Sequence, residues 1–377
     1  LVFLFRRLSS GRPRPRPDRI RQALLVSTTG LGDTVISTAA MALAREVWPK
    51  AKIYALVHRR WASLFRVCPF LDGLVVYPGK FRQVRSLIRR LRELNLDLAV
   101  VLHANDPDIL PLVWLSRARQ IVCRDTTRFN FLVDTPVSFP DPSRHIAERR
   151  MDLIRAAGLG PAEVRRGGAA QADGGLRSRA PALCIPEETR SWADEYWKDQ
   201  GLRAGEKLVV LNPGGSRQAK RWPGGHWREL IRLLSGRPGL KTALFGSPAE
   251  AKLMQALSQV PGAAGMPVVA RSDVLEAAAL LEKAAVLIGP DSGLVHLAAA
   301  LGVAVAALFG PDNPTLSAPY LTRAPAAALQ GQAQVCPDLA DCHKKVCPNN
   351  VCLSEITPQS VLDALKKDLN FPLDFQP

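Results

Sequence analysis

The chain has 377 residues, of which 47% are hydrophobic and 22% charged, and its 50 basic and 34 acidic side chains give a formal net charge of +16. This length fits two domains of about 150 residues each. No apolar run approaches the ~20 residues that a transmembrane helix needs. The seven cysteines do not resemble the framework of a secreted disulfide-rich domain, so a reducing cytoplasm is the expected compartment. The charge predicts a polyanionic partner, which is a nucleic acid, an anionic membrane surface or a phosphorylated substrate.

Two stretches in the first quarter of the chain are strongly basic. Residues 1–20, "LVFLFRRLSSGRPRPRPDRI", have apolar and basic parts in the wrong order for a secretory signal and predict a basic tail. Residues 81–94, "FRQVRSLIRRLREL", place apolar residues from Phe81 to Leu94 at helical spacing, with five arginines between them. This second stretch is either an amphipathic helix on an anionic membrane or a packed helix with a solvated basic face. A nucleic-acid partner is disfavoured, because only 6% of the residues are aromatic and no base-stacking motif is present.

Apolar, β-branched runs alternate with helical patterns along the whole chain, which is typical of βαβ units and parallel sheets. In the first half, strands are expected at 23–28, 52–58 and 96–104, with a helix at 34–48 after the first of them. In the second half, strands are expected at 207–214, 241–246, 266–270, 284–289 and 304–310. A helix at 272–284 is expected to begin at an N-cap on Ser272, and the last helix at a Thr357-Pro358 pair.

These patterns predict an α/β fold of two Rossmann-like, doubly wound domains that face each other across a cleft, with the active site at the carboxyl ends of the strands. A Gly-, Ala- and Arg-rich stretch without periodicity separates the two halves. The expected organisation is a basic tail at 1–20, an N-terminal Rossmann-like domain at 21–160, a linker at 161–181, a C-terminal Rossmann-like domain at 182–355, and a helix and tail at 356–377 that could pack back on the N-terminal domain.

The first loop with chemical character is "STTGLGDT", which follows the first strand. Gly30 and Gly32 allow a tight turn and a close approach of the backbone to a ligand, and Asp33 stands at the entry to the next helix. Asp33 is either a catalytic carboxylate or only a helix cap. The glycine fingerprint for a dinucleotide is incomplete, because position 35 is Val.

The second loop is "NPGGSRQAKRWP". Gly214, Gly215 and Ser216 follow a strand and offer backbone N–H groups and a hydroxyl to an anion. Lys220 stands four residues further on, where its ammonium could meet a phosphate or could be a solvated loop charge.

The third loop lies in "IGPDSGLVHLAAALG", residues 288–302, between a strand and a helix. Ser292 and Gly293 near the helix N-terminus would present N–H groups and the positive end of the helix dipole to an anion. Asp291 suits sugar hydroxyls or backbone amides better than a phosphate. His296, in the first helical turn, could donate to a phosphate oxygen, although an Asp N-cap and a core histidine are the alternative.

Taken together, "GLGDTVISTAAMALAREVWPKAKIYALV", "LNPGGSRQAKRWPGGHWREL" and "LIGPDSGLVHLAAALGVAVAALFGPDNP" resemble, in order and spacing, the signature segments of glycosyltransferase family nine, the ADP-heptose:lipopolysaccharide heptosyltransferases. The resemblance implies a GT-B fold and an inverting, metal-independent transfer of a heptose from ADP-heptose to a core sugar of lipopolysaccharide. The acceptor would be an anionic glycolipid, and the protein would be cytoplasmic with peripheral contact at the inner membrane. The alternatives are another nucleotide sugar, another glycan or protein acceptor, and a non-catalytic nucleotide-sugar-binding protein.

By position, the resemblance implies that Asp33 is the general base, that Gly30 and Gly32 belong to the acceptor-side loop, and that Lys220 meets the donor phosphates. The implied donor-binding set is Gly215, Ser216, Lys220, Glu250, Asp291, Ser292, Gly293, Leu294 and His296. Val295 and Pro290 depart from residues common in relatives, which leaves the donor sugar open.

Four late cysteines in "CPDLADCHKKVCPNNVC" have five, four and four residues between them. Cys336, Cys342, Cys347 and Cys352 could hold a structural Zn or Fe, remain free or packed thiols, or form disulfides. The "NDPD" at 105–108 resembles a D-x-D metal motif, but we interpret it as a loop. It contains Pro and lies in the N-terminal domain at 21–160, which the resemblance makes the acceptor-side domain. No cofactor is expected to be required for catalysis.

Overall fold

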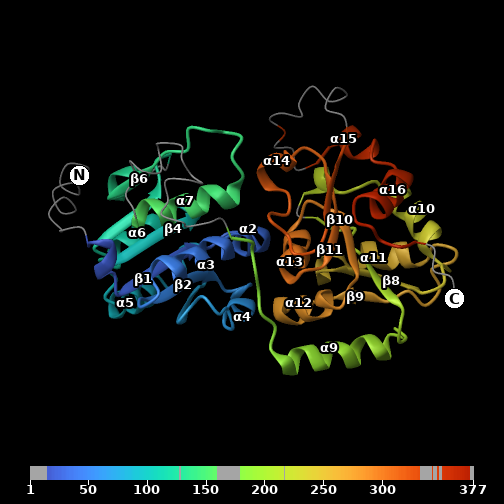
Figure 1. Cartoon of the computed structure of the whole chain (residues 1–377), viewed down its shortest axis with the longest axis horizontal. Helices are drawn as coiled ribbons and strands as arrows, with labels where there is room; N and C mark the ends of the chain where they lie inside the picture. Colours follow the sequence, from blue (N-terminus) through green and yellow to red (C-terminus); the bar gives the residue numbers. More distant parts are fainter. Residues whose placement is uncertain are drawn as a thin grey trace. The chain divides into compact units, whose positions relative to one another are not determined.

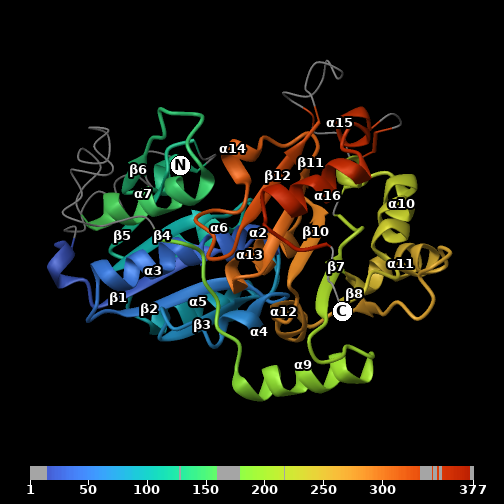
Figure 2. The same cartoon turned by 45° about the vertical axis from the view of Figure 1, so that its right-hand side comes forward.

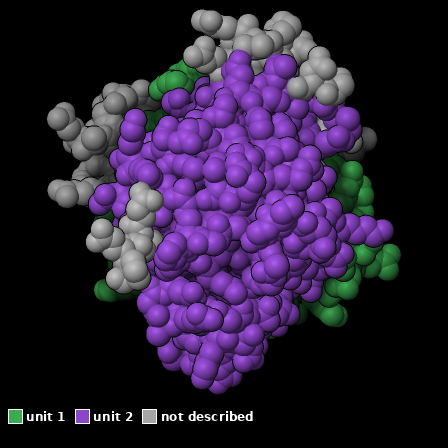
Figure 3. Space-filling model, turned by 90° about the vertical axis from the view of Figure 1, so that its right-hand side faces the viewer, with its two compact units in different colours: residues 1–184 green, residues 185–377 purple. Residues whose placement is uncertain are grey.

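The structure, a computed structural model, describes residues 15–126, 129–158, 179–215, 217–331, 342, 346–347 and 350–373. The chain divides into two compact units, Leu1–Cys184 (unit 1) and Ile185–Pro377 (unit 2) (Figures 1 and 3). Each unit is built on a six-stranded parallel sheet, which confirms the α/β class with two doubly wound halves. Residues 1–14 of the expected basic tail and most of the expected linker lie outside the described residues.

The sheet of unit 1 has the strand order β3-β2-β1-β4-β5-β6. Its strands are β1 (Gln22–Ser27), β2 (Lys52–His58), β3 (Gly73–Tyr77), β4 (Leu98–His103), β5 (Gln120–Arg124) and β6 (Thr135–Val137). All six run parallel, and in the register Leu24 lies beside both Tyr54 and Ala99. Five of the six residues of β1 are buried, because helices cover both faces of the sheet.

The helices of unit 1 are η1 (Pro17–Arg19), α2 (Leu31–Ile36), α3 (Thr38–Val47), α4 (Ala62–Phe65), α5 (Val84–Glu93), α6 (Ile109–Leu115), η2 (Asn130–Leu132) and α7 (Ile146–Gly158). On one face, Leu87 and Leu91 of α5 pack with Leu24 and Val26 of β1 and with α6. On the other face, α7 packs against α3 and strands β4 to β6. Among the described residues, no helix has the length and apolar character of a membrane span.

Two expected helices of unit 1 have different bounds in the structure. The helix expected at 34–48 begins earlier and is interrupted at Ser37, whose hydroxyl donates to the Asp33 carbonyl at 3.0 Å. Such back-bonding by Ser and Thr locally competes with the helical pattern. The helix expected at 81–94 is α5, which excludes Phe81: that residue has φ 56° and a 64% exposed side chain.

The sheet of unit 2 has the strand order β12-β11-β10-β7-β8-β9. Its strands are β7 (Lys207–Leu211), β8 (Leu240–Gly246), β9 (Val268–Ala270), β10 (Val286–Pro290), β11 (Ala304–Phe309) and β12 (Ala326–Gln330). Its helices are α9 (Glu187–Asp199), η3 (Gln218–Lys220), α10 (Gly224–Leu234), η4 (Pro248–Glu250), α11 (Ala251–Ser258), α12 (Val274–Glu282), α13 (Gly293–Leu301), α14 (Pro314–Ser317), α15 (Val351–Ser354) and α16 (Pro358–Lys367). Figure 2 shows α10, α11 and α16 along one side of this sheet and α12 and α13 along the other.

The structure tests the two N-caps that were expected in unit 2, those of α16 and α12. Thr357 Oγ1 accepts from the backbone N–H of Ser360 at 3.1 Å, and Pro358 opens α16, as expected. The predicted N-cap at Ser272 is wrong: Asp273 caps α12, because its carboxylate accepts from the N–H of Leu275 at 2.7 Å. Helix α16 packs against α10, β11 and β12, so it belongs to the core of unit 2.

Candidate active site

The first cluster of polar side chains lies at the carboxyl end of the unit 1 sheet, around Asp33. Asp33 is in the first turn of α2, directly after β1 and its connecting loop. Gly30 is the N-cap of α2 at φ −64°, and Gly32 lies inside the helix.

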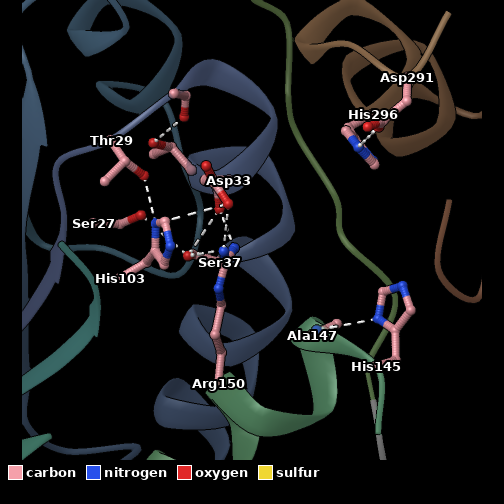
Figure 4. Close-up of polar contacts among 12 residues, drawn as sticks. Ser27, Thr29, Asp33, Ser37, His103, His145, Ala147, Arg150, Asp291 and His296 are labelled. Atoms are coloured by element: carbon pink, nitrogen blue, oxygen red, sulfur yellow. Dashed lines mark hydrogen bonds and ion pairs between the residues drawn. The ribbon is translucent and has the colours of Figure 1, made fainter. Parts of the chain in front are cut away.

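Arg150 of α7 holds the Asp33 carboxylate (Figure 4). Its Nη2 donates to Asp33 Oδ1 at 2.7 Å, and its Nη1 donates to the Asp33 carbonyl and, at 3.1 Å, to Ser37 Oγ. The Arg150 side chain is only 4% exposed, whereas that of Asp33 is 34% exposed. Burial lowers the pKa of Arg150 and the Asp33 charge opposes the change, so the guanidinium stays charged. The pair therefore presents an oriented carboxylate on a buried cation.

His103, the last residue of β4, completes this cluster. Its Nδ1 lies 3.7 Å from Asp33 Oδ1 and 2.5 Å from Thr29 Oγ1 (Figure 4). Burial, followed by the positive charge of Arg150, lowers the His103 pKa to about 4, although Asp33 acts in the opposite direction. The imidazole is therefore neutral near pH 7 and contributes hydrogen bonding without charge.

Sequence reasoning missed both Arg150 and His103. The available signal for His103 was its place at the end of a buried strand, where ligand-binding residues of parallel sheets gather. For Arg150, the signal was an arginine on the apolar side of a helix, between the buried residues Ala147 and Ile154.

A cavity of about 300 Å³ opens beside His103, at the carboxyl ends of β4 and β5. Its lining includes His103, Ala104, Asn105, Asp106, Arg124 and Thr126. The "NDPD" loop contributes to this wall, and Asp106 and Asp108 both accept from the Tyr77 hydroxyl, at 3.1 and 2.9 Å. Those carboxylates brace the loop, in agreement with its interpretation as a loop.

In unit 2, the glycine-rich loop after β7 rests on Glu250. Glu250 Oε1 accepts from the N–H of Gly215 at 2.8 Å, and Oε2 accepts from the N–H of Ser247 at 2.8 Å. A Cβ on Gly214 would clash with the Glu250 carboxylate, so a side chain there would displace Glu250 from Gly215. Ser216, expected to contact the donor, lies outside the described residues.

Lys220, at the end of η3, lies between two carboxylates. Its Nζ is 2.6 Å from Asp291 Oδ2 and also contacts Asp312 Oδ2. Burial lowers the pKa of Lys220, but the two carboxylates outweigh it and raise the pKa above its usual value. Asp312 in turn accepts from Arg217 Nη2 at 3.2 Å. Sequence reasoning did not single out Asp312 or Arg217.

Asp291 directly follows β10, and the expected donor-binding residues Ser292, Gly293, Leu294 and His296 follow it into α13. Burial would raise the Asp291 pKa, but His296 and Lys220 hold it well below its usual range. His296 Nε2 lies 3.5 Å from Asp291 Oδ1, and its side chain is 8% exposed (Figure 4). Ser292 is the N-cap residue, and its hydroxyl donates to Asn212 Oδ1 at 3.2 Å. Lys220, Asp291 and His296 therefore form one contiguous polar cluster.

The described part of the chain does not support the expected structural metal. Among those residues, no group of three or more His, Cys, Asp or Glu side chains is arranged to hold a metal ion. Cys336 lies outside the described residues, and within the described part of the chain Cys342, Cys347 and Cys352 form no disulfide bond. The Cys347 sulfur accepts from the N–H of Asn350 at 3.2 Å, and Cys352 is buried in the core beside α16.

Three comparisons with known proteins agree on one family. The profile described as "Glycosyltransferase family 9 (heptosyltransferase)" matches residues 84–346. Lipopolysaccharide heptosyltransferase 2 of Salmonella typhimurium is 26% identical over 357 residues, which cover 91% of this chain and 97% of that protein. The solved family 9 glycosyl transferase of Veillonella parvula aligns with a TM-score of 0.76 at 23% identity, over 93% of this chain and 97% of its own. The E. coli ADP-heptose LPS heptosyltransferase II aligns with a TM-score of 0.74 at 21% identity, over 93% and 98% of the two chains.

Two parallel, doubly wound sheets and the likeness to these solved structures define a protein of the GT-B fold class. Within that class, the chain belongs to glycosyltransferase family 9.

Proposed function

We propose that this enzyme is an inverting, metal-independent heptosyltransferase that moves a heptose from ADP-heptose to a core sugar of lipopolysaccharide. The observation that carries the proposal is the Asp33 carboxylate held on Arg150 at 2.7 Å, in a chain whose other unit carries the buried Lys220 cluster. The names of the family and of its relatives, which include an ADP-heptose transferase and a lipopolysaccharide heptosyltransferase, support this donor and acceptor.

Asp33 is the proposed general base. A sugar hydroxyl is a weak nucleophile, so a carboxylate must take its proton as the new glycosidic bond forms. Arg150 keeps that carboxylate oriented, and the neutral His103 leaves the negative charge of Asp33 in place. The acceptor oxygen attacks the anomeric carbon from the face opposite the diphosphate, the bond from that carbon to the phosphate oxygen breaks, and ADP leaves. One displacement inverts the anomeric configuration.

Unit 2 is the proposed donor-binding unit. Lys220 and the first turn of α13 at Ser292, Gly293 and Leu294 would bind the diphosphate, beside the Gly215 turn that Glu250 holds in place. Fixed donors of this kind stabilise the growing charge on departing ADP, and each is worth about 3 kcal/mol in comparable sites. Asp291 and His296 would contact the sugar side, with Ser216 and Glu250 at the edge of the site. Because cationic and amide groups supply the stabilisation, the proposed reaction does not depend on a metal.

We also propose that the enzyme binds the anionic surface of the inner membrane through Phe81 and the basic face of α5. Phe81 is 64% exposed, and its backbone, at φ 56°, is held by a 2.9 Å hydrogen bond from its N–H to the buried Asp108. A positive φ is unfavourable for a bulky residue, so the loop is fixed in a conformation that exposes the ring. Lys80 Nζ lies 5.5 Å from the ring centroid, and the exposed Arg85 and Arg89 of the following helix α5 add positive charge to this part of the chain. An apolar ring among cations suits a membrane interface.

The direct test is to incubate the enzyme with ADP-heptose and a heptose-free lipopolysaccharide core, with and without EDTA. We expect ADP release, a product heavier by one heptose, no effect of EDTA, and an inverted anomeric centre by NMR. Asp33→Asn should retain ADP binding and lose turnover. Absence of ADP release with every acceptor would overturn the transferase assignment, and loss of activity in EDTA would overturn metal independence.

A further inference from the structure

Asp312 joins the two cations of the glycine-rich loop of unit 2. It follows the carboxyl end of β11, next to β10 and Asp291 in the sheet. Its Oδ2 contacts Lys220 Nζ, and its two oxygens lie 3.3 and 3.2 Å from Arg217 Nη2. A carboxylate that bridges an ammonium and a guanidinium has the geometry of a phosphate group held by the same two cations.

The two carboxylates on Lys220 differ in how firmly they are held. The Asp291 side chain is 11% exposed, lies 3.5 Å from His296, and its backbone N–H donates to Leu308. The Asp312 side chain is 33% exposed, and the two cations are its partners. Asp312 is therefore the carboxylate that can leave the cluster at lower cost.

The backbone around Asp312 would not need to move. The Asp312 carbonyl accepts from Gln330 Nε2 at 3.3 Å. The next residue, Asn313, caps α14 by accepting from the N–H of Thr315 at 2.9 Å. With both sides anchored, a side-chain rotation suffices to withdraw the carboxylate from Lys220 and Arg217.

We propose that Arg217 is a second ligand of the donor diphosphate, and that Asp312 occupies the phosphate position until the donor displaces it. The inference rests on the proposed nucleotide-sugar donor. The formal charges of Arg217, Lys220, Asp291 and Asp312 cancel, so an entering diphosphate meets an attractive site only after the Asp312 carboxylate withdraws. The same carboxylate competes with ADP after transfer and so favours product release.

The test compares Arg217→Gln with Asp312→Asn by calorimetric titration of ADP, AMP and adenosine into the full chain. We expect Arg217→Gln to weaken ADP binding about tenfold, as for loss of one charge-assisted hydrogen bond. Asp312→Asn should tighten ADP binding several-fold and slow ADP release. Both effects should be smaller for AMP, absent for adenosine, and reduced at high salt. Arg217→Lys should recover part of the ADP affinity.

The two substitutions are expected to change ADP affinity in opposite directions, and this distinguishes the inference from a purely structural role of the cluster. If the cluster only stabilises the fold, both variants should lower the melting temperature and weaken all three ligands alike, which would overturn the inference. The exposed Arg232–Glu229 pair of α10 provides the matched control. Arg232→Gln and Glu229→Gln should leave ADP affinity unchanged. If wild-type protein binds no ADP, the proposed donor fails; if it binds ADP and the two variants shift affinity in the same direction, only this inference fails.

Discussion

Replacing Arg150 with Met tests whether a buried cation makes Asp33 an effective base. The substitution removes the hydrogen bonds to Asp33 and Ser37 while preserving most of the side-chain volume. A hydrogen bond to a charged partner is worth about 1.5–3 kcal/mol. If that energy orients the carboxylate in the transition state, kcat/KM should fall by about 10- to 150-fold. Because Asp33 itself remains, the loss should be smaller than in Asp33→Asn.

The same substitution should change the titration of His103. The Arg150 charge is, after burial, the second cause that lowers the His103 pKa to about 4. Without that charge, the His103 pKa should rise toward its usual value of 6.5, which NMR titration of the imidazole can follow. Steady-state assays of ADP release, with a thermal melt to confirm folding, provide the rates.

Arg155→Met is the matched control for Arg150→Met. Arg155 lies on the same helix with the same 4% side-chain exposure, but it pairs with Glu148 and Asp152. It should alter stability without affecting the His103 pKa. If Arg150→Met keeps full turnover, or slows it no more than Arg155→Met does, the proposed positioning of Asp33 is wrong.

Three further predictions address the loop, the pH dependence and the membrane surface. Gly214→Ala should weaken ADP binding, because the new methyl would clash with the Glu250 carboxylate. Gly215→Ala should be tolerated, because the nearest neighbour of its methyl would be 3.7 Å away. Calorimetric titration of ADP into the two variants compares their affinities. The folded-state pKa of His103 is depressed, so its protonation penalty should appear as pH falls from 6.5 to about 4 and cost on the order of 3 kcal/mol of unfolding free energy. In urea titrations, the difference in unfolding free energy between wild type and His103→Asn should change within that window and stay constant above it. Phe81→Ser should reduce co-sedimentation with phosphatidylglycerol vesicles severalfold, whereas Leu321→Ser, which alters a 53% exposed residue at φ 43° in unit 2, should not; equal binding by both variants would exclude the Phe81 surface.

Most long buried strands were predictable from sequence, as was the short edge strand β9, whereas β3, β5, β6 and β12 were not predicted. The run around β1 and its counterparts in unit 2 is apolar throughout, as strands covered on both faces must be. β6 has three residues and includes Pro136, and β12 at the sheet edge alternates with exposed positions. Such segments bury too little apolar surface to stand out from loops. The N-cap error at Ser272 arose because Ser and Asp are both good caps and stand side by side.

Only those residues of the candidate site that belong to a local sequence pattern were predictable. Glycine-rich turns after strands and an Asp or Lys within them are local patterns, so Asp33, Lys220 and Asp291 stood out. Their partners Arg150 and Asp312 come from other elements, and no spacing rule links positions 117 or 92 residues apart, as Asp33 and Arg150 or Lys220 and Asp312 are. Those partners follow from topology, which places the ends of distant strands and helices together.

The contact between Arg150 and Asp33 also determines when the polar cluster of unit 1 can form during synthesis. The ribosome delivers the β1 turn long before α7, the last helix among the described residues of unit 1, and domains acquire their contacts as units while the chain emerges. A nascent chain that ends after β5 would carry the carboxylate on a turn without its cation. Docking of α7 is therefore the event that makes this half of the enzyme competent, and truncation before residue 150 should leave a chain that cannot turn over.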